Sequence, residues 1–508
     1  MKGKWAIAIC LVLSMVTIPS ALAGASDTFV ITPTGVDDTA NIQAAFDAAI
    51  AAGPGSVVEL AAGDFYLSEP ILIDDFSGTF RGQGSSRSVI HLTPNTLFGL
   101  VQWPVPDLPA APLIFYLMYH EDGAVLRWES MGFDLVGEGK PWHHPWFPEP
   151  YWMDALWPVW IEGINGIRHV DTVWWDVQVK GDESPDYVWG WNANPILSRN
   201  LSGTHHVTNC HFDTLVYGLL FGYHDGSKMT VGGPRPEDRV TFHNVQFGVV
   251  SLASVNSEIQ ILNARAWNDE STLWGYDVLW VASASGLKVH MSGVEADNMS
   301  GAYLGADASG VCGATPSTYL FEHNTIRQPP GTTWAGFEIW ETCPVKSNIV
   351  IRNNKISGDG SFLFGPIFTL GARSGTVIAN NQISGSGPAA MYLGAASWWG
   401  ADDSGLMVKG NNVQGWKVDS GPCGSLCQGL PLAPIWLGAK TSGITVVGSG
   451  NPRTTVFDET DDPATPKYDG ANILVGVNAR GAHMGQAIRD AMQQRIEVKK
   501  QFMNKRPF

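Results

Sequence analysis

Charged residues are scarce in this chain of 508 residues, of which Asp, Glu, Lys and Arg make up 16%. The 31 Lys and Arg are outnumbered by 48 Asp and Glu, which gives a formal net charge of −17. A chain so short of cations has no strongly basic surface, and this argues against nucleic acid and anionic membranes as partners. It also weakens the case for a polyanionic substrate and favours a neutral or weakly charged one.

Long hydrophobic runs are absent beyond the first residues of the chain. Lys2 and Lys4 precede an apolar run from Trp5 to Ile18, and Ala21-Leu22-Ala23 is a small-residue cleavage site. This run is too short for a membrane span, so residues 1–23 are predicted to be a secretory signal peptide. We therefore expect a secreted or periplasmic protein with no membrane span.

Cysteine is also rare, with five residues after the signal peptide. Disulfides are allowed outside the cytoplasm. Cys312 and Cys343 are 31 residues apart and are predicted to join adjacent repeats, while Cys423 and Cys427 flank a tight turn that they would close. The Cys423 spacing also matches half of a zinc site, but no second half lies nearby. Cys210 is predicted to be a small buried residue.

An asparagine repeat is the most informative pattern in the chain. Asn324, Asn354, Asn381 and Asn411 follow one another at steps of 30, 27 and 30 residues, each after a β-branched run. A repeat of this length predicts a solenoid whose unit is strand, one-residue bend, strand, loop and strand. An Asn at the bend is expected to adopt the left-handed conformation and to bond to the Asn one coil away. The sequence therefore predicts an all-β parallel β-helix.

Both ends of the chain are predicted to differ from the repeat. Residues 35–73 read as an N-terminal cap, with a helix that begins at Asp38-Thr39, turns one apolar face inward and stops at Gly53. Short strands are expected at 57–60, 64–67 and 71–73. Residues 481–508 are predicted to form a C-terminal helix or tail, because apolar residues recur there every four positions. The solenoid itself is expected to span 24–480 as one domain.

A tryptophan-rich segment at 142–191 departs from the repeat and is predicted to be a loop insertion. Tryptophans at this density must be buried or must form a binding wall, since exposed they would favour aggregation. Packing of the loop on itself is an equal alternative. Nine tryptophans lie there: Trp142, Trp146, Trp152, Trp157, Trp160, Trp174, Trp175, Trp189 and Trp191.

The N-terminal segment resembles a known superfamily. Gly35-Val36-Asp37-Asp38-Thr39 through Ala45, then Gly63-Asp64-Phe65-Tyr66, then Arg81-Gly82-Gln83-Gly84, is similar to the opening of pectate-lyase-like proteins. The resemblance covers residues 27–92, and the asparagine repeat extends it to about 478. It implies a single-stranded right-handed parallel β-helix and a secreted protein active on polysaccharides. The superfamily is functionally broad, so this likeness does not name a reaction.

Catalytic motifs of the superfamily's enzymes are missing or incomplete. The polygalacturonase set of Asn-Thr-Asp, paired Asp-Asp and Gly-His-Gly is not found, since Asp402-Asp403 stands alone in a Gly-rich loop and Asp37-Asp38 belongs to the helix cap. Tyr223-His224-Asp225-Gly226 resembles a fragment of the Asp-Pro-His-Asp motif of mannuronan epimerases. The subfamily is therefore not identified.

The third strand of each repeat carries an aromatic pattern. Its flanking residues are aliphatic, so strand alternation points them inward and the central residue outward. Aromatic rings in a row suit the apolar faces of sugars, and this predicts a substrate-binding groove that also includes Trp340; the alternative is that loops cover the row. The outward residues are Trp160, Trp280, Tyr303, Glu338, Thr369, Tyr392 and Trp436.

Carboxylates near this row suggest glycoside hydrolysis, which uses two of them as acid and base or nucleophile. Glu338 is the leading candidate, and Glu341 and Asp307 are the next ones. Asp269-Glu270 and Glu322-His323 lie one coil away. The predicted function is a glycoside hydrolase acting on a neutral or weakly charged glycan.

Two other functions remain open from the sequence. A lyase or epimerase acting on a uronic-acid polymer would use a base among Tyr223, His224 and Asp225, with Ca²⁺ as a cofactor of the lyase. A non-catalytic glycan-binding surface protein would need the aromatic row alone. No shared metal site is expected at His205 and His206, because neighbours on a strand point to opposite faces.

Overall fold

The computed structural model describes residues 27–481, except for gaps at 94–99, 102–110, 137–155, 183–192, 194–195, 270–276, 306–312, 329–334, 342–344, 346, 360–364, 395–402, 420–432, 439–440, 449–454, 459, 461–471 and 476. The predicted signal peptide, residues 482–508 of the predicted C-terminal helix, and Cys312, Cys343, Cys423 and Cys427 lie outside the described residues.

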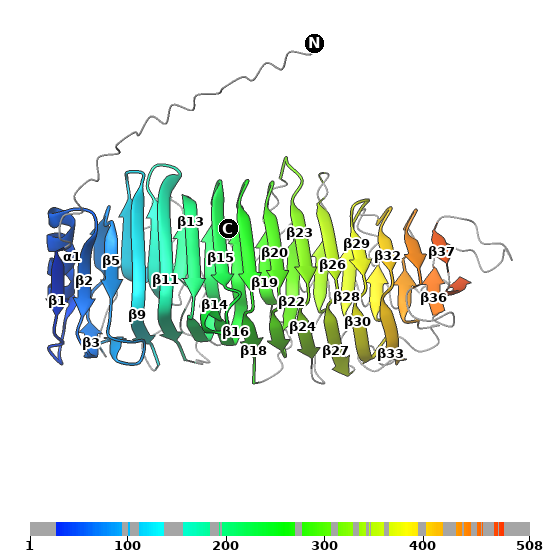
Figure 1. Ribbon diagram of the computed structural model, residues 1–508, viewed down its shortest axis with the longest axis horizontal. Helices are drawn as coiled ribbons and strands as arrows, with labels where there is room; N and C mark the ends of the chain where they lie inside the picture. The colour runs from blue at the N-terminus through cyan, green and yellow to red at the C-terminus, as the bar shows by residue number, and fades with distance from the viewer. Residues whose placement is uncertain are drawn as a thin grey trace, which may run out of the picture.

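The described chain forms one long right-handed parallel β-helix, which confirms the predicted fold class (Figure 1). Strands of successive coils pair in parallel, and the solenoid runs from the capped end at β1 to β38. No helix of the described residues is long and apolar enough to cross a membrane.

Each regular coil has three strands, which stack into three sheets. The pre-bend sheet, before the asparagine, contains β17 (Glu258–Leu262), β20 (Lys288–Ser292), β23 (Thr318–Glu322), β26 (Asn348–Arg352), β29 (Val377–Ala379), β32 (Met407–Lys409), β35 (Thr445–Val447) and β37 (Ile473–Val475). The post-bend sheet contains β18 (Arg265–Trp267), β21 (Glu295–Asp297), β24 (Thr325–Gln328), β27 (Lys355–Asp359), β30 (Gln382–Gly387) and β33 (Asn412–Val418). The third-strand sheet contains β19 (Asp277–Ala282), β22 (Ser300–Gly305), β25 (Phe337–Trp340), β28 (Ile367–Leu370), β31 (Met391–Leu393), β34 (Ile435–Leu437), β36 (Thr455–Asp458) and β38 (Asn478–Gly481).

Some earlier strands are longer and pass from one sheet to the next, namely β9 (Ala124–Asp134), β11 (Arg168–Lys180), β14 (His211–Gly222) and β16 (Thr241–Leu252). The other strands of this part are β8 (Ala111–Tyr119), β10 (Trp157–Gly163), β12 (Ile196–Arg199), β13 (Leu201–Thr208) and β15 (Ser227–Gly232). For example, β14 pairs with β11 at one end and with β12 at the other. The predicted loop insertion at 142–191 is thus in part solenoid, since β10 and β11 lie within it.

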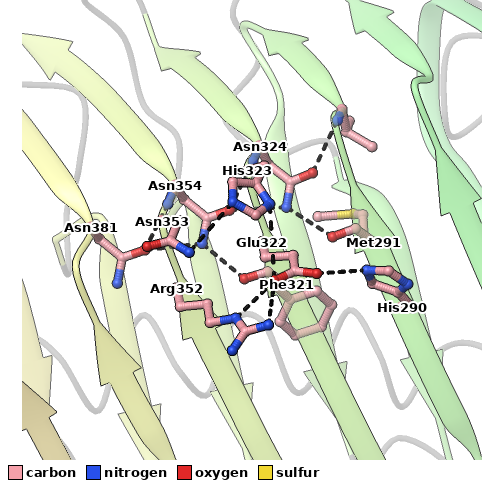
Figure 2. A network of polar contacts seen from close by, with 11 residues as sticks. His290, Met291, Phe321, Glu322, His323, Asn324, Arg352, Asn353, Asn354 and Asn381 are labelled. Carbon is pink, nitrogen blue, oxygen red and sulfur yellow. Dashed lines mark hydrogen bonds and ion pairs between the residues drawn. The ribbon is translucent and has the colours of Figure 1, made fainter. Parts of the chain in front are cut away.

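The asparagine ladder forms as predicted (Figure 2). The backbone amide and Nδ2 of Asn324 both donate to Oδ1 of Asn354, at 3.0 Å each. Asn354 donates in the same way to Asn381, and Asn381 to Asn411. Every ladder amide is 1% exposed. These bonds satisfy polar groups at the corner of the coil, which would otherwise be buried without partners.

The left-handed residue at the bend is not the one predicted. It precedes the ladder asparagine and is His323 (φ 57°), Asn353 (φ 56°), Asn380 (φ 54°) or Gly410 (φ 63°) in successive coils. The bend therefore takes two residues, one in the left-handed region and one whose side chain joins the ladder. The position before the ladder residue is itself often Asn or Gly, because these two residues adopt the left-handed conformation at low cost.

The N-terminal cap is confirmed. Helix α1 (Thr39–Ala52) buries Ile42, Phe46 and Ala49, and Gly53 ends it with φ 101°. Asp38 stands before the helix but bonds to the backbone amides of Thr34 and Tyr66. The helix contacts the first coil, whose strands are β1 (Thr28–Ile31), β2 (Ser56–Leu60), β3 (Gly63–Leu67) and β4 (Ile71–Asp74), followed by β5 (Gly78–Arg81), β6 (Ser88–Leu92) and β7 (Leu100–Val101). It covers the open end of the core (Figure 1).

Candidate functional site

The predicted outward row exists on the third-strand sheet. Trp280, Tyr303 and Glu338 occupy matching positions on β19, β22 and β25. The row continues through Phe368 on β28, because Thr369 is aligned with the inward Ile339. The prediction for Thr369 was therefore wrong by one residue: its hydroxyl points inward and donates to Asp403.

The row is buried. Trp160, Trp280, Tyr303, Tyr392 and Trp436 are between 1 and 3% exposed. None of the five belongs to the inner core cluster, which confirms their outward direction. The rings pack on one another instead, as in the Tyr392–Trp436 pair with ring centroids 5.1 Å apart. The expected open aromatic groove does not form over these coils.

The predicted carboxylates on this sheet are buried as well. Glu338 is 1% exposed, and Oε1 accepts a hydrogen bond of 2.6 Å from Nε1 of the fully buried Trp340. Glu341 accepts from the backbone amide of Ser347 at 3.1 Å. It lines a cavity of about 20 Å³, room for one water molecule and not for a sugar. Asp307 lies outside the described residues. Catalysis by Glu338 or Glu341 stays a prediction that requires this face to be uncovered.

The predicted second site does not come together. Tyr223 is 36% exposed, while His224 is fully buried inside the solenoid. Asp225 is exposed and accepts from Nδ2 of Asn256 at 3.3 Å. His205 is 1% exposed and His206 is exposed, so these two histidines point to opposite faces as expected.

Glu322 sits in a network on the outer side of the pre-bend sheet (Figure 2). Arg352 donates to Oε2 at 2.7 Å, and Nε2 of His290 is 3.1 Å from Oε1. Burial works to raise the pKa of Glu322, but Arg352 and His290 outweigh it and lower the pKa. A carboxylate held ionised in this way stabilises neighbouring coils and is a poor proton donor.

Asp269, the other carboxylate named beside the row, lies by the post-bend sheet. Its Oδ2 is 2.9 Å from Nε2 of His243 and accepts from Nδ2 of Asn244. Bonds from Asn244 and His243 lower the pKa of Asp269. Glu270 lies outside the described residues.

The carboxyl best suited to proton transfer is Glu162, which the sequence analysis did not name. Oε2 accepts from the Tyr116 hydroxyl at 3.0 Å and from Nε1 of Trp160 at 3.2 Å. Oε1 lies 3.5 Å from Nη1 of Arg199 and 3.4 Å from Nδ2 of Asn200. We call Glu162, Tyr116, Trp160 and Arg199 the Glu162 cluster.

Strand register builds the Glu162 cluster. Glu162 on β10 is aligned with Arg199 on β12, and Trp160 is aligned with Tyr116 on β8. All four side chains therefore share the outer side of the third-strand sheet. Alternation was the available signal, because Glu162 follows Trp160 by two positions on one strand.

Burial sets the protonation of Glu162. The residue is 2% exposed, and burial raises the pKa of its carboxyl despite Arg199 and the bonds from Tyr116 and Trp160. A carboxyl with a raised pKa beside a cation and an aromatic ring has the chemistry of a general acid.

Tyr223 borders the cluster on its exposed side. The guanidinium carbon of Arg199 lies 5.0 Å from the centroid of the Tyr223 ring. Tyr223 has φ 55°, and Ala253 (φ 50°) and Ser283 (φ 54°) have the same left-handed conformation at the matching bends of the next two coils, so this conformation belongs to the bend.

Metal ligands do not gather in the described part of the chain: no group of three or more His, Cys, Asp or Glu there could hold a metal ion.

Comparisons with known proteins found similarity to solved structures alone. No family model matches the chain, and no curated protein matches it. The Agl-KA catalytic domain is 14% identical over 90% of this chain and 69% of its own, with a TM-score of 0.42. The A-module of the mannuronan C-5 epimerase AlgE6 from Azotobacter vinelandii is 14% identical over 88% and 97%, with a TM-score of 0.39.

A third similar structure is the catalytic unit of the GH87 α-1,3-glucanase from Streptomyces thermodiastaticus strain HF3-3. It is 12% identical over 91% of this chain and 70% of its own, with a TM-score of 0.40. Function is therefore assigned from the residues of this chain.

Proposed function

We propose that this chain is a secreted polysaccharide-active protein, and that it is a glycoside hydrolase whose general acid is Glu162. The observation that carries the proposal is the raised pKa of a buried carboxyl held by Tyr116, Trp160 and Arg199. Glycosidases use such a carboxylic acid to protonate the leaving oxygen. The exposed Tyr223 ring at the border of the cluster suits a sugar face, and the low cation content suits a neutral or weakly charged glycan.

Asp74 is the second carboxylate in this proposal. It lies at the end of β4 in register with Met118, and Met118 is in register with Glu162, so the three share the outer side of the sheet. One strand, β8, separates Asp74 from Glu162 on this face. The proposal takes the enzyme to be inverting, in which water fits between carboxyl groups about 6.5–9.5 Å apart.

The reaction follows from these two roles. Glu162 gives its proton to the glycosidic oxygen as the bond from that oxygen to the anomeric carbon breaks. Asp74 takes a proton from water, whose oxygen forms the new bond to the anomeric carbon. Glu162 is buried, so the proposal requires a substrate-bound state in which the glycosidic oxygen contacts its carboxyl group.

The test is a panel of neutral and uronic polysaccharides incubated with the mature protein. Reducing ends and the ultraviolet band of unsaturated uronates are followed together, with and without EDTA. We expect new reducing ends without the ultraviolet band, and NMR should show products of inverted configuration. The Glu162→Gln protein should lose at least 100-fold in kcat, because general acid catalysis is worth about 10²–10⁴-fold. Glu69→Gln, at an exposed site, is the matched control.

A second candidate is a polysaccharide lyase or epimerase, which the stacking of Arg199 on Tyr223 favours. Tyrosine serves as a base and arginine neutralises a uronate in this chemistry. A rising ultraviolet band that is lost in Tyr223→Phe would select the lyase and reject Glu162 as the acid of a hydrolase. An epimerase would change the NMR spectrum of the uronic polymer without the band or new reducing ends. Binding with none of these changes would reject all three enzymes and favour a non-catalytic glycan-binding protein.

A further inference from the structure

A cleft lies on the outer side of the post-bend sheet, on a different sheet from the Glu162 cluster. Its volume is about 670 Å³, within the range of ligand-binding pockets. Its lining runs from Asn268, just after β18, to Lys417 on β33 and so crosses six consecutive coils. That span is about 24 Å along the solenoid axis. The shape is that of a groove for an extended chain.

Small residues make the floor of this cleft. The position of Arg327 on β24 is taken by Ser357 on β27 and Ser384 on β30. The position of Gln328 is taken by Gly358 and Gly385 in the same two coils. Large side chains are thus missing over two coils, and backbone and hydroxyl groups line the opening. The surface left behind is polar, which suits a hydroxylated ligand.

Unpaired polar atoms line one end of the cleft. Nδ2 and Oδ1 of Asn268 have no hydrogen-bond partner, although the residue is 8% exposed. Oδ1 of Asn298 is also unpaired in a residue that is 5% exposed, while its Nδ2 donates to the Asn268 carbonyl. Buried amides without partners cost free energy, and a bound ligand that pairs with them recovers it.

Two cations line the cleft, Arg327 between its first coils and its floor and Lys417 on its last coil. Arg327 is 52% exposed at its side chain and uses Nη1 to bond Asp297 at 2.9 Å, which leaves its other donors toward solvent. Lys417 is exposed and has no ion-pair partner within the described ranges. A register shift between β30 and β33 places Lys417 opposite Ser386. The described lining therefore carries a local positive charge in a chain of net charge −17.

We propose that this cleft is a separate binding site for an acidic oligosaccharide, with a uronate carboxylate on Arg327 and another on Lys417. Serine hydroxyls and the amides of Asn268 and Asn298 bond the sugar hydroxyls. Arginine pairs with carboxylates through two parallel bonds, and this gives the site its preference for uronates. The proposal does not depend on Glu162 or on catalysis.

The test is calorimetric titration of the Glu162→Gln protein with a hexamer of galacturonic acid and with cellohexaose as the neutral probe. This background prevents the proposed turnover, and the hydrolysis panel with unmodified protein stays an independent test. We expect the uronate hexamer to bind at least tenfold more tightly than cellohexaose and less tightly as salt is raised. Arg327→Gln and Lys417→Gln should each weaken it about tenfold.

Two further variants distinguish binding in the cleft from nonspecific attraction between the protein's cations and the acidic hexamer. Ser384→Leu fills the floor and should abolish binding with an unchanged circular dichroism spectrum. Lys288→Gln removes the same charge on the pre-bend sheet and should leave the affinity unchanged. Equal affinity for the two hexamers, no binding of either, or unaltered binding in both Arg327→Gln and Ser384→Leu would overturn the proposal.

Discussion

At the scale of single residues, the solenoid buries a polar cluster around two histidines. Nε2 of His224 is 3.0 Å from the Ser198 hydroxyl, and Nδ1 is 2.8 Å from that of Ser227. Nδ1 of His205 is 3.0 Å from the Thr172 hydroxyl, and the two histidine rings are 5.0 Å apart. These partners satisfy the neutral rings, and a proton added to either ring would be a buried charge.

This cluster predicts acid sensitivity. Burial lowers the pKa of His224 to about 4, and burial with the nearby His224 lowers that of His205 well below its usual value. Below pH 6.5 the unfolded chain binds protons that the folded chain refuses, so stability is full above that pH and falls as the pH drops toward 4. For His224 the loss is roughly 3 kcal/mol. Urea unfolding between pH 4 and 7 measures it.

Substitution of His224 separates this effect from other titrations. Burial raises the pKa of Asp403 to about 6, and that group works in the opposite direction over the same range. The comparison is therefore made between variants. His224→Gln should unfold with a flatter pH dependence than the unmodified protein, whereas the exposed His206→Gln should keep the original slope. Parallel slopes in all three proteins would contradict the assignment.

At the scale of elements, the third-strand sheet has two buried layers. Its inward residues fill the core, and its outward aromatic row is buried on the other side. A row predicted to hold sugar therefore contributes to stability in this structure. Burial of a large ring is worth several kcal/mol through the area it removes from water and the contacts it makes.

Tryptophan substitutions distinguish the two roles of this row. Trp280 is 1% exposed and its ring lies 5.2 Å from that of Phe247, whereas Trp175 on β11 is 47% exposed. We expect Trp280→Ala to cost about 3–5 kcal/mol and Trp175→Ala less than about 1 kcal/mol. Denaturant unfolding checks both values. A Trp280→Ala protein of unchanged stability would mean that the row is not packed as described.

At the scale of the whole molecule, each coil is stabilised by its neighbours, and the first coil depends on the cap. Phe46 of α1 is fully buried, with its ring 5.1 Å from that of Phe76 and 5.0 Å from that of Phe80. In a solenoid the free energy of unfolding is nearly a sum over coils and their interfaces. Loss of the cap should therefore be felt mainly at its own end.

Hydrogen exchange tests this locality. Phe46→Ala should cost about 3–5 kcal/mol in the first coils and should reduce amide protection in β1 to β5 far more than in β26 to β34. Val36→Ala is the control, because Val36 is 75% exposed beside the same helix. A uniform loss of protection along the chain would show instead that the solenoid unfolds as one unit.

The fold could be predicted from the sequence because its signals are local and repeated. The spacing of Asn324, Asn354, Asn381 and Asn411 fixed the coil length, and hydrophobic alternation fixed which residues face inward. The errors arose where the hydrophobic pattern allowed two assignments that differ by one residue. Ile367, Phe368 and Leu370 are all apolar, so alternation did not settle whether Phe368 or Thr369 points outward, and the pairing of Phe368 with Glu338 decided it.

The candidate site could be predicted less well, because it depends on contacts between coils. Trp160 was identified from its strand. The hydrogen bond and the ion pair of Glu162 come from Tyr116 on one neighbouring strand and Arg199 on the other, which are 46 and 37 positions away in the chain. The cleft on the post-bend sheet depends on small residues in register over two coils, Ser357 with Ser384 and Gly358 with Gly385, and a single repeat does not show such a register.

The sequence by itself determined the solenoid, its N-terminal cap, the ladder at its corners and the direction of the strand residues that alternate clearly, which excludes Phe368 and Thr369. These follow from periodicity and local backbone preference, which act over a few residues. The tertiary structure alone decided which outward residues are buried, which carboxyl has a raised pKa and where a cleft opens. Exposure and pKa depend on what lies above and beside a side chain, and coil stacking brings those neighbours together from distant parts of the chain.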